Sequence, residues 1–219
     1  MSNREGRPRL FLANPDGSYV VRLTKDDDLP SERGPACSRD GKLVAFFGSH
    51  GKGSDLYIIN SNGSGLRRLT EGAAANMEPS WSPDAKRLAF MSNREGGFNI
   101  HLINADGTGL SRLTDSKGLD TDPSWSPDGK RIAYSSKRDL ERGIYVMSLE
   151  GQVVTRLTEG GEDETNPAWS PDGKRIAFAR GDERTRDFDI YIIDADGGEA
   201  TRITDDPAVD VSPCWIRGP

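Results

Sequence analysis

Acidic side chains gather in five stretches of the sequence that recur about every 44 residues. These stretches are residues 25–34, 71–78, 115–122, 159–166 and 205–212, and together they hold 16 acidic and 3 basic residues. The chain as a whole carries 35 acidic residues, 29 Lys and Arg and a net charge of -6, so negative charge is concentrated here. Such a surface attracts cations and basic peptides and disfavours nucleic acid. We therefore expect a protein or basic peptide as the partner.

Oxygen-bearing side chains within or beside these stretches are the candidates for contact with that partner. They are Glu78, Asp120, Asp122, Asp163, Glu164, Asn166 and Asp210. Three of them, Glu78, Asp122 and Asn166, each precede a proline at equivalent positions, and oxygen ligands of this kind suit a hard cation such as Ca²⁺. The sequence thus suggests a docked partner and a Ca²⁺ ion. The alternative, solvated loops without a ligand, stays open.

Residues with catalytic potential are sparse and poorly placed. His50 and His101 are the only histidines, and neither stands at metal-ligand spacing from another His or Cys. A Gly-x-Ser-x-Gly nucleophile elbow does not occur. The stretch Gly51-Lys52-Gly53-Ser54 lacks the upstream glycine of a phosphate-binding loop. We predict no catalytic residues, and a protein that is not an enzyme.

An internal repeat supplies the elements that must position the acidic residues. Trp81, Trp125 and Trp169 are 44 residues apart, and Trp215 follows after 46. The first three are each followed by Ser-Pro-Asp and then Gly, or Ala85 once, which is a tight-turn sequence because Pro fixes φ and Gly accepts a positive φ. Each repeat continues with a short apolar strand, a variable stretch, a third strand, a second tight turn and a fourth strand.

Four short antiparallel strands per repeat predict the blades of an all-β propeller. The repeated indoles, Trp81, Trp125, Trp169 and Trp215, are then core wedges between blades. We expect one domain over residues 1–219 with about five blade positions. Four are residues 35–70, 79–114, 123–158 and 167–204, and an incomplete closing blade combines about 1–24 with 213–219. A closed monomer is favoured, while a piece of a longer propeller and an edge-paired dimer remain alternatives.

The repeat resembles the TolB-like β-propeller family, of the TolB C-terminal propeller type. The stretch Trp169-Ser170-Pro171-Asp172-Gly173-Lys174 carries the resemblance most clearly. It implies a periplasmic or extracytoplasmic protein that binds another protein. No signal peptide opens this chain, and no apolar run is long enough for membrane insertion.

The variable connections point to where function resides. The loops between second and third strands, and those from one blade to the next, lie on one face of an up-and-down blade, and variable loops on a rigid frame commonly bind ligands. We predict a non-catalytic binding or scaffold propeller that docks a protein or peptide on this acidic face. One alternative is a propeller fragment or gating domain of a prolyl-oligopeptidase-like peptidase. Another is a structural repeat fragment with no ligand.

Overall fold

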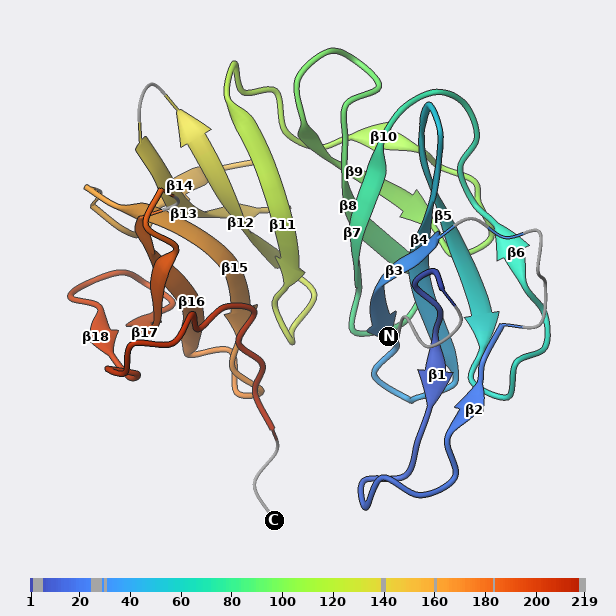
Figure 1. The fold of residues 1–219 in the computed structure, drawn as a ribbon. Helices are drawn as coiled ribbons and strands as arrows, with labels where there is room; N and C mark the ends of the chain where they lie inside the picture. Colours follow the sequence, from blue (N-terminus) through green and yellow to red (C-terminus); the bar gives the residue numbers. More distant parts are fainter. Residues whose placement is uncertain are drawn as a thin grey trace. The chain divides into compact units, whose positions relative to one another are not determined.

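The computed structural model of the chain is an all-β structure (Figure 1). It describes residues 1, 6–24, 29, 31–138, 141–159, 161–182 and 184–216. Asp26, Asp27 and Asp28 of the first acidic stretch, and residues 217–219 of the predicted closing blade, lie outside the described residues. The described part of the chain contains no helix with the length and apolar character that a membrane crossing requires.

Four sheets share one build, in which four antiparallel strands follow the order of the chain. The first holds β3 (Ser31–Cys37), β4 (Leu43–His50), β5 (Gly53–Asn60) and β6 (Arg67–Arg68). The second holds β7 (Asn76–Trp81), β8 (Arg87–Ser92), β9 (Asn99–Asn104) and β10 (Ser111–Arg112). The third holds β11 (Leu119–Trp125), β12 (Arg131–Arg138), β13 (Glu141–Ser148) and β14 (Val154–Arg156). The fourth holds β15 (Asp163–Trp169), β16 (Arg175–Asp182), β17 (Asp187–Asp194) and β18 (Thr201–Arg202).

These sheets are the predicted blades, so the fold class of an all-β propeller with four-stranded antiparallel blades is confirmed. The fifth blade is not confirmed. At the start of the chain, β1 (Phe11–Leu12) and β2 (Val21–Arg22) form a two-stranded sheet. Near the other end, residues 213–216 belong to no strand.

The chain divides into two compact units. The first unit comprises Met1–Gly96 with His101–Arg112, and the second comprises Gly97–Ile100 with Leu113–Pro219. The first and second blades therefore fall largely in the first unit, while the third and fourth blades lie wholly in the second.

The tight turn after the first strand of each blade is held by its own side chains. In the second blade the Ala85 N–H donates to the Ser82 carbonyl at 2.9 Å, and the Ser82 hydroxyl donates to Asp84 Oδ1 at 2.6 Å. Lys86 N–H donates to the same carboxylate oxygen at 3.1 Å. These hydrogen bonds, that of Ser82 most of all, hold the pKa of Asp84 below its usual value. The same bonds recur around Asp40, Asp128 and Asp172.

The hydrophobic core lies between neighbouring blades within each unit. In the second unit Trp169 packs with Ile144, Val146 and Ile176, residues from the third and fourth blades. Its indole N–H donates to the Ser124 carbonyl of the preceding blade at 3.1 Å. The Trp169 indole therefore fixes the fourth blade to the backbone of the third as well as covering apolar surface.

The other repeated tryptophans follow the same geometry where it is described. Trp81 donates to the Ala36 carbonyl at 3.0 Å, and Trp215 donates to the Ala168 carbonyl at 2.9 Å. Trp81, Trp125 and Trp169 are only 7%, 6% and 8% exposed, whereas Trp215 is half-buried.

First strands begin before the proline that the sequence had suggested as their start. The ladder with the second strand shifts register around that proline, as between Thr121 and Ser124 in the third blade. Proline lacks an N–H donor, so a bulge is one of the few places where a strand accepts it. Six acidic residues expected in blade-to-blade loops consequently lie within strands. They are Glu32, Glu78, Asp120, Asp122, Asp163 and Glu164.

The residue before that proline adopts a left-handed backbone conformation in all five repeats. The φ angles are 55° at Gly34, 49° at Glu78, 53° at Asp122, 54° at Asn166 and 56° at Ser212. This conformation is uncommon for residues other than glycine. At Glu78, Asp122 and Asn166 the bulge therefore fixes the direction of the side chain at a local cost in backbone strain.

Replacing Ala85 with glycine should stabilise the protein. Ala85 has a φ of 56° where the equivalent turns hold glycine, and an L-residue in this region costs about 1–2 kcal/mol. Glycine also makes the unfolded chain more flexible, which offsets about 0.4–1 kcal/mol. We expect Ala85→Gly to raise the free energy of unfolding by about 0.5–1 kcal/mol in urea denaturation. The reverse change at an open turn, Gly41→Ala, is the control and should destabilise. A less stable Ala85→Gly variant would contradict this account.

Truncating Trp169 should destabilise the second unit strongly. Trp169→Ala removes a buried indole and its hydrogen bond to Ser124, and substitutions of this type cost about 3–5 kcal/mol. Trp215→Ala should cost less, because this side chain is already half-buried. Chemical denaturation of both variants measures the difference. Equal losses in the free energy of unfolding would show that burial of the indole between two blades adds nothing to stability.

Candidate functional site

Two pockets occupy equivalent places in the second and fourth blades. The pocket of the fourth blade, here called the loop pocket, has a volume of about 330 Å³ and is lined by Arg142, Gly161, Glu162, Asp163, Gly181, Asp182 and Arg184. The pocket of the second blade has a volume of about 500 Å³ and is lined by Glu71, Ala73, Ala74, Asn93 and Arg94. Residues 161, 162, 181 and 182 of the first pocket correspond to 73, 74, 93 and 94 of the second, two repeats of 44 residues earlier. Equivalent backbone positions in the two blades thus line a pocket with different side chains.

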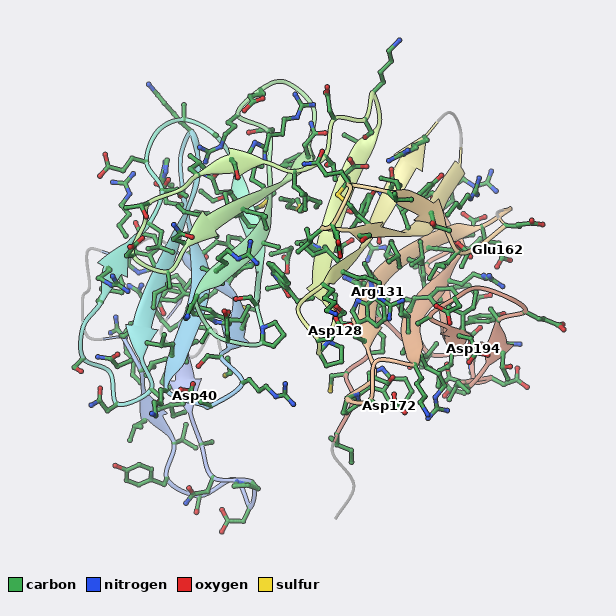
Figure 2. All side chains as sticks on the ribbon, turned by 180° about the vertical axis from the view of Figure 1, so that it is seen from behind. Asp40, Asp128, Arg131, Glu162, Asp172 and Asp194 are labelled. Atoms are coloured by element: carbon green, nitrogen blue, oxygen red, sulfur yellow. The ribbon has the colours of Figure 1, made fainter. Side chains whose placement is uncertain are left out.

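The loop pocket is formed by the variable connections that the sequence placed on one face. Its residues come from the start of β15, the end of β16 and β13. In Figure 2 the turn residues Asp128 and Asp172 lie towards the bottom of the second unit, and Glu162 lies higher. Glu162 and Asp172 flank opposite ends of β15. The pocket is therefore separated from the uniform tight turns by the length of a strand.

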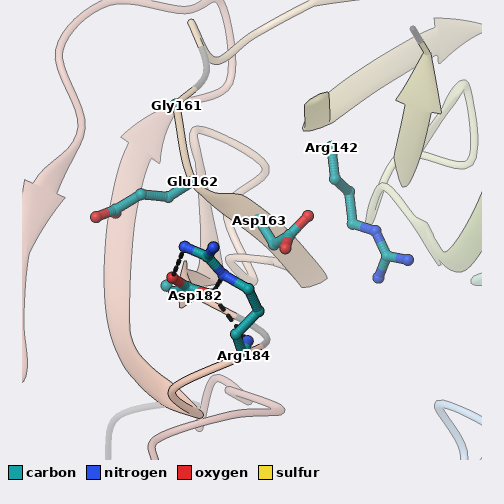
Figure 3. Close-up of a pocket in the computed structure, with 7 residues that line it drawn as sticks. Arg142, Gly161, Glu162, Asp163, Asp182 and Arg184 are labelled. Carbon is teal, nitrogen blue, oxygen red and sulfur yellow. Dashed lines mark hydrogen bonds and ion pairs between the residues drawn. The ribbon is translucent and has the colours of Figure 1, made fainter. Parts of the chain in front are cut away.

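Charges in the loop pocket are only partly compensated (Figure 3). Arg184 Nη2 lies 2.8 Å from Asp182 Oδ2, and the Arg184 backbone N–H donates to Asp182 Oδ1 at 2.8 Å. The hydrogen bonds from the Arg184 side chain and backbone lower the pKa of Asp182 to about 2, so this carboxylate is ionised and paired.

Glu162 and Asp163 are the uncompensated acids of the loop pocket. Glu162 is exposed and Asp163 is half-buried. Figure 3 shows the Asp163 carboxylate on the side of Arg142 and the Glu162 carboxylate directed the other way. Neither carboxylate accepts a hydrogen bond or forms an ion pair with any described residue. Both remain available to a cationic group of a ligand.

Two other predicted contact residues, Asp120 and Glu164, are buried inside their blades. Glu164 lies 2.7 Å from Arg180 Nη2 and also accepts a hydrogen bond from the Thr158 hydroxyl. Asp120 accepts a hydrogen bond from the Ser136 hydroxyl at 2.5 Å. Side chains alternate between the faces of a strand, so Glu164 points away from the side that Asp163 occupies. These two carboxylates connect first strands to neighbouring strands and do not line the loop pocket.

Asp122 and Asn166 meet at neighbouring first strands of the second unit. The Thr121 hydroxyl donates to Asp122 Oδ2 at 2.9 Å, and the Asn166 backbone N–H lies near enough to this carboxylate to lower its pKa. Burial raises the pKa of Asp122, while Thr121, Arg142 and the Asn166 N–H act in the opposite direction. A half-buried acid of this kind gains from the approach of a cation.

Glu78, the third predicted metal ligand, belongs to the first unit. Its Oε2 atom lies 3.4 Å from the point where a Cβ on Gly34 would stand, so it faces the backbone of the first blade. In the described residues, no group of three His, Cys, Asp or Glu side chains is arranged to hold a metal ion. The Ca²⁺ site at Glu78, Asp122 and Asn166 stays a prediction.

Asp210, the last predicted contact residue, sits beside the fourth blade. Its backbone N–H donates to the Phe188 carbonyl at 2.8 Å. Its side chain is half-buried, and the Oδ2 atom is enclosed without a hydrogen-bond partner.

Sequence comparison decides the family of this architecture. The family model of the TolB beta propeller domain matches residues 30–100 and 79–188, which together cover most of the chain. The chain belongs to the TolB β-propeller domain family. A search of curated proteins found no match.

Solved structures agree with this TolB-family assignment. TolB from Acinetobacter baumannii is 26% identical with a TM-score of 0.78, and the match covers 90% of this chain and 48% of that protein. A putative TolB from Agrobacterium tumefaciens is 25% identical with a TM-score of 0.74, covering 89% of this chain and 80% of the other. A puromycin-hydrolyzing peptidase from Mycobacterium tuberculosis is 14% identical with a TM-score of 0.68, over 86% of this chain and 30% of the peptidase, and shares the fold. This TolB-family propeller thus spans about half of the first relative.

Four lining residues of the loop pocket in this TolB-family propeller were absent from the predicted contact set. They are Arg142, Glu162, Asp182 and Arg184. Glu162 belongs to an acidic stretch, and the sequence placed the other three in the connections between second and third strands, where the structure has Arg142 within β13 and Asp182 as the last residue of β16. The signal for them was their place on the variable face. What the sequence lacked was the pairing of Asp182 with Arg184, which leaves Glu162 and Asp163 as the open acids.

The opposite pKa shifts of Asp122 and Asp182 predict opposite effects of neutralisation. The pKa of Asp122 in the folded protein lies above its value in the unfolded chain, so the fold is favoured while Asp122 is protonated. That contribution to stability is lost as the pH rises through the folded-state pKa. Asp122→Asn should therefore melt at a higher temperature than the parent at pH 7, with the difference vanishing near pH 4. For Asp182 the lowered pKa stabilises the fold above the unfolded pKa, and this contribution is lost as pH falls towards about 2.

Asp182→Asn is accordingly the control, and it should melt slightly lower than the parent at pH 7. Thermal melts of both variants between pH 3 and pH 7 measure the two signs. A lower melting temperature for Asp122→Asn at pH 7 would contradict the role assigned to burial.

Proposed function

We propose that this TolB-family chain is a non-catalytic binding propeller that docks a protein or a basic peptide on its variable loop face. The loop pocket of the fourth blade forms part of the docking surface. The observation that supports this most directly is the pair of open carboxylates, Glu162 and Asp163, beside an acid that Arg184 already neutralises. Lysine and arginine side chains form charge-assisted hydrogen bonds with such carboxylates.

The recurrence of the pocket supports binding over a purely structural role. The tight turns at the other end of the strands hardly differ between blades, whereas these connections do. The pocket of the second blade instead has Ala73 and Ala74 where the fourth blade has Gly161 and Glu162. Varied chemistry on a constant frame is typical of recognition loops.

The proposed binding is electrostatic, and this sets its strength. Exposed charge pairs contribute about 0.2–1 kcal/mol each, so they govern association rate and salt dependence more than final affinity. Family resemblance supports a location outside the cytoplasm, in the periplasm, and we propose that the module is a monomer. We also propose a Ca²⁺ ion at Glu78, Asp122 and Asn166, and calorimetric titration with CaCl₂ tests it.

A second candidate is the propeller part of a peptidase. Its support is the shared fold with the puromycin-hydrolyzing peptidase, of which the match covers 30%. The coding sequence on either side of this chain distinguishes the two, because an adjoining α/β-hydrolase segment would favour the peptidase.

Neutralising the open acids should weaken binding of a cationic peptide. We expect the double variant Glu162→Gln with Asp163→Asn to bind a tetralysine peptide about twofold to thirtyfold more weakly at low salt, since two lost charge pairs amount to about 0.4–2 kcal/mol. Isothermal titration calorimetry measures the affinity. Glu199→Gln removes an exposed acid beyond the opposite end of the strands and serves as the matched control. Equal affinities of the double variant and the control would rule out the loop pocket as the docking surface.

A further inference from the structure

A polar pair connects the first strand to the second strand in three of the four blades. Its first member stands five residues before the repeated tryptophan, and its second member follows 16 residues later. All three first-strand members are at most 1% exposed. The pairs are Asn76 with Ser92 at 2.8 Å, Asp120 with Ser136 at 2.5 Å and Glu164 with Arg180 at 2.8 Å.

Residues 210–216 lie against the fourth blade in the geometry of a further first strand. The N–H of Asp210 donates to the Phe188 carbonyl at 2.8 Å, as the N–H of Asp120 donates to the Phe98 carbonyl at 2.9 Å. The indole of Trp215 donates to Ala168 at 2.9 Å. Arg175 stacks on Trp215 with its guanidinium carbon 5.0 Å from the ring centre. These contacts hold the segment against the fourth blade.

The outer side of the same segment has no partner strand among the described residues. Asp210 stands five residues before Trp215, the position of the polar pair, yet its buried Oδ2 atom accepts no hydrogen bond from the described chain. Val209, Val211 and Ile216 are 52%, 47% and 84% exposed. The segment thus combines an enclosed, unsatisfied carboxylate oxygen with exposed apolar side chains and an open backbone edge, which readily pairs with another strand.

We propose that this edge, residues 210–216, is a docking site for one extended β-strand that presents an arginine to Asp210. The fourth blade supplies the pattern of the ligand strand, because there Glu164 lies opposite Arg180 and Trp169 lies opposite Ile176. The ligand strand runs antiparallel, with an aliphatic residue opposite Trp215 and an arginine opposite Asp210. Backbone hydrogen bonds provide most of the affinity, and the buried ion pair selects the sequence. This site is independent of the loop pocket.

A synthetic peptide tests the proposal on the intact chain. The sequence of residues 173–182, Gly-Lys-Arg-Ile-Ala-Phe-Ala-Arg-Gly-Asp, carries the required pattern. We expect saturable binding by calorimetry, and new amide protection at residues 211, 212 and 214–216 in hydrogen exchange. Asp210→Asn in the protein should weaken binding about tenfold, the effect of losing a buried charge-assisted bond. Replacing the arginine opposite Asp210 with alanine in the peptide should do the same, even if Asp210→Asn disturbs folding.

Combining Asp210→Asn in the protein with the arginine-to-alanine change in the peptide tests whether these two side chains contact each other. If the arginine binds Asp210, the double change should weaken binding little more than either single change. Glu199→Gln should leave the affinity unchanged, and a scrambled peptide should not bind. Additive losses would overturn the assignment of Asp210 as the contact. Absence of saturable binding at millimolar peptide would overturn the site, as would amides of residues 211, 212 and 214–216 already protected without peptide, which would mean that the chain or a second copy covers the edge.

Discussion

The wedge of one indole between two sheets is the contact on which this molecule depends. A four-stranded blade buries little of its own surface, so it is stable only when its faces are covered by neighbours. Trp169 does this for the third and fourth blades, and its N–H bond to the Ser124 carbonyl sets the register between them. The arginine six residues after one tryptophan then covers the next one, as Arg131 does over Trp169 at 4.6 Å. Apolar contact, hydrogen bond and cation–π stacking thus act at one point.

Backbone strain at the first strands follows from that anchoring. The bulge before each proline places residues such as Asp122 and Asn166 in a conformation that costs of order 1–3 kcal/mol per residue. The strands are held on both sides of the bulge, by the turn that follows the tryptophan and by the buried polar pairs that precede it. The strain directs polar side chains of adjacent blades towards one another, and it brings the Asn166 N–H to the Asp122 carboxylate.

The fold could be predicted from the sequence because each strand and turn recurs in several copies of the repeat. The 44-residue spacing, the turn sequence and the strand order all appear in the structure, and the family assignment rests on the same residues. The start of the first strand was placed too late because Pro79, Pro123 and Pro167 are strand breakers in most contexts, and a bulge was not visible in the sequence. Counting charges in the sequence did not distinguish acids that line the pocket from acids that are buried inside a blade. Asp163 and Glu164 are neighbours in sequence, yet one lines the loop pocket and the other is enclosed beside Arg180. Pairing partners such as Arg184 for Asp182 depend on side-chain direction, which periodicity does not specify.

The recurrence of one pocket frame in two blades has an evolutionary consequence. Because residues 73–74 and 161–162 occupy the same place relative to their sheets, the segments are interchangeable between blades without altering a core side chain. Duplication of a blade therefore duplicates this frame, and its loop segment can change in one copy without disturbing the tryptophan contacts that hold the blades together.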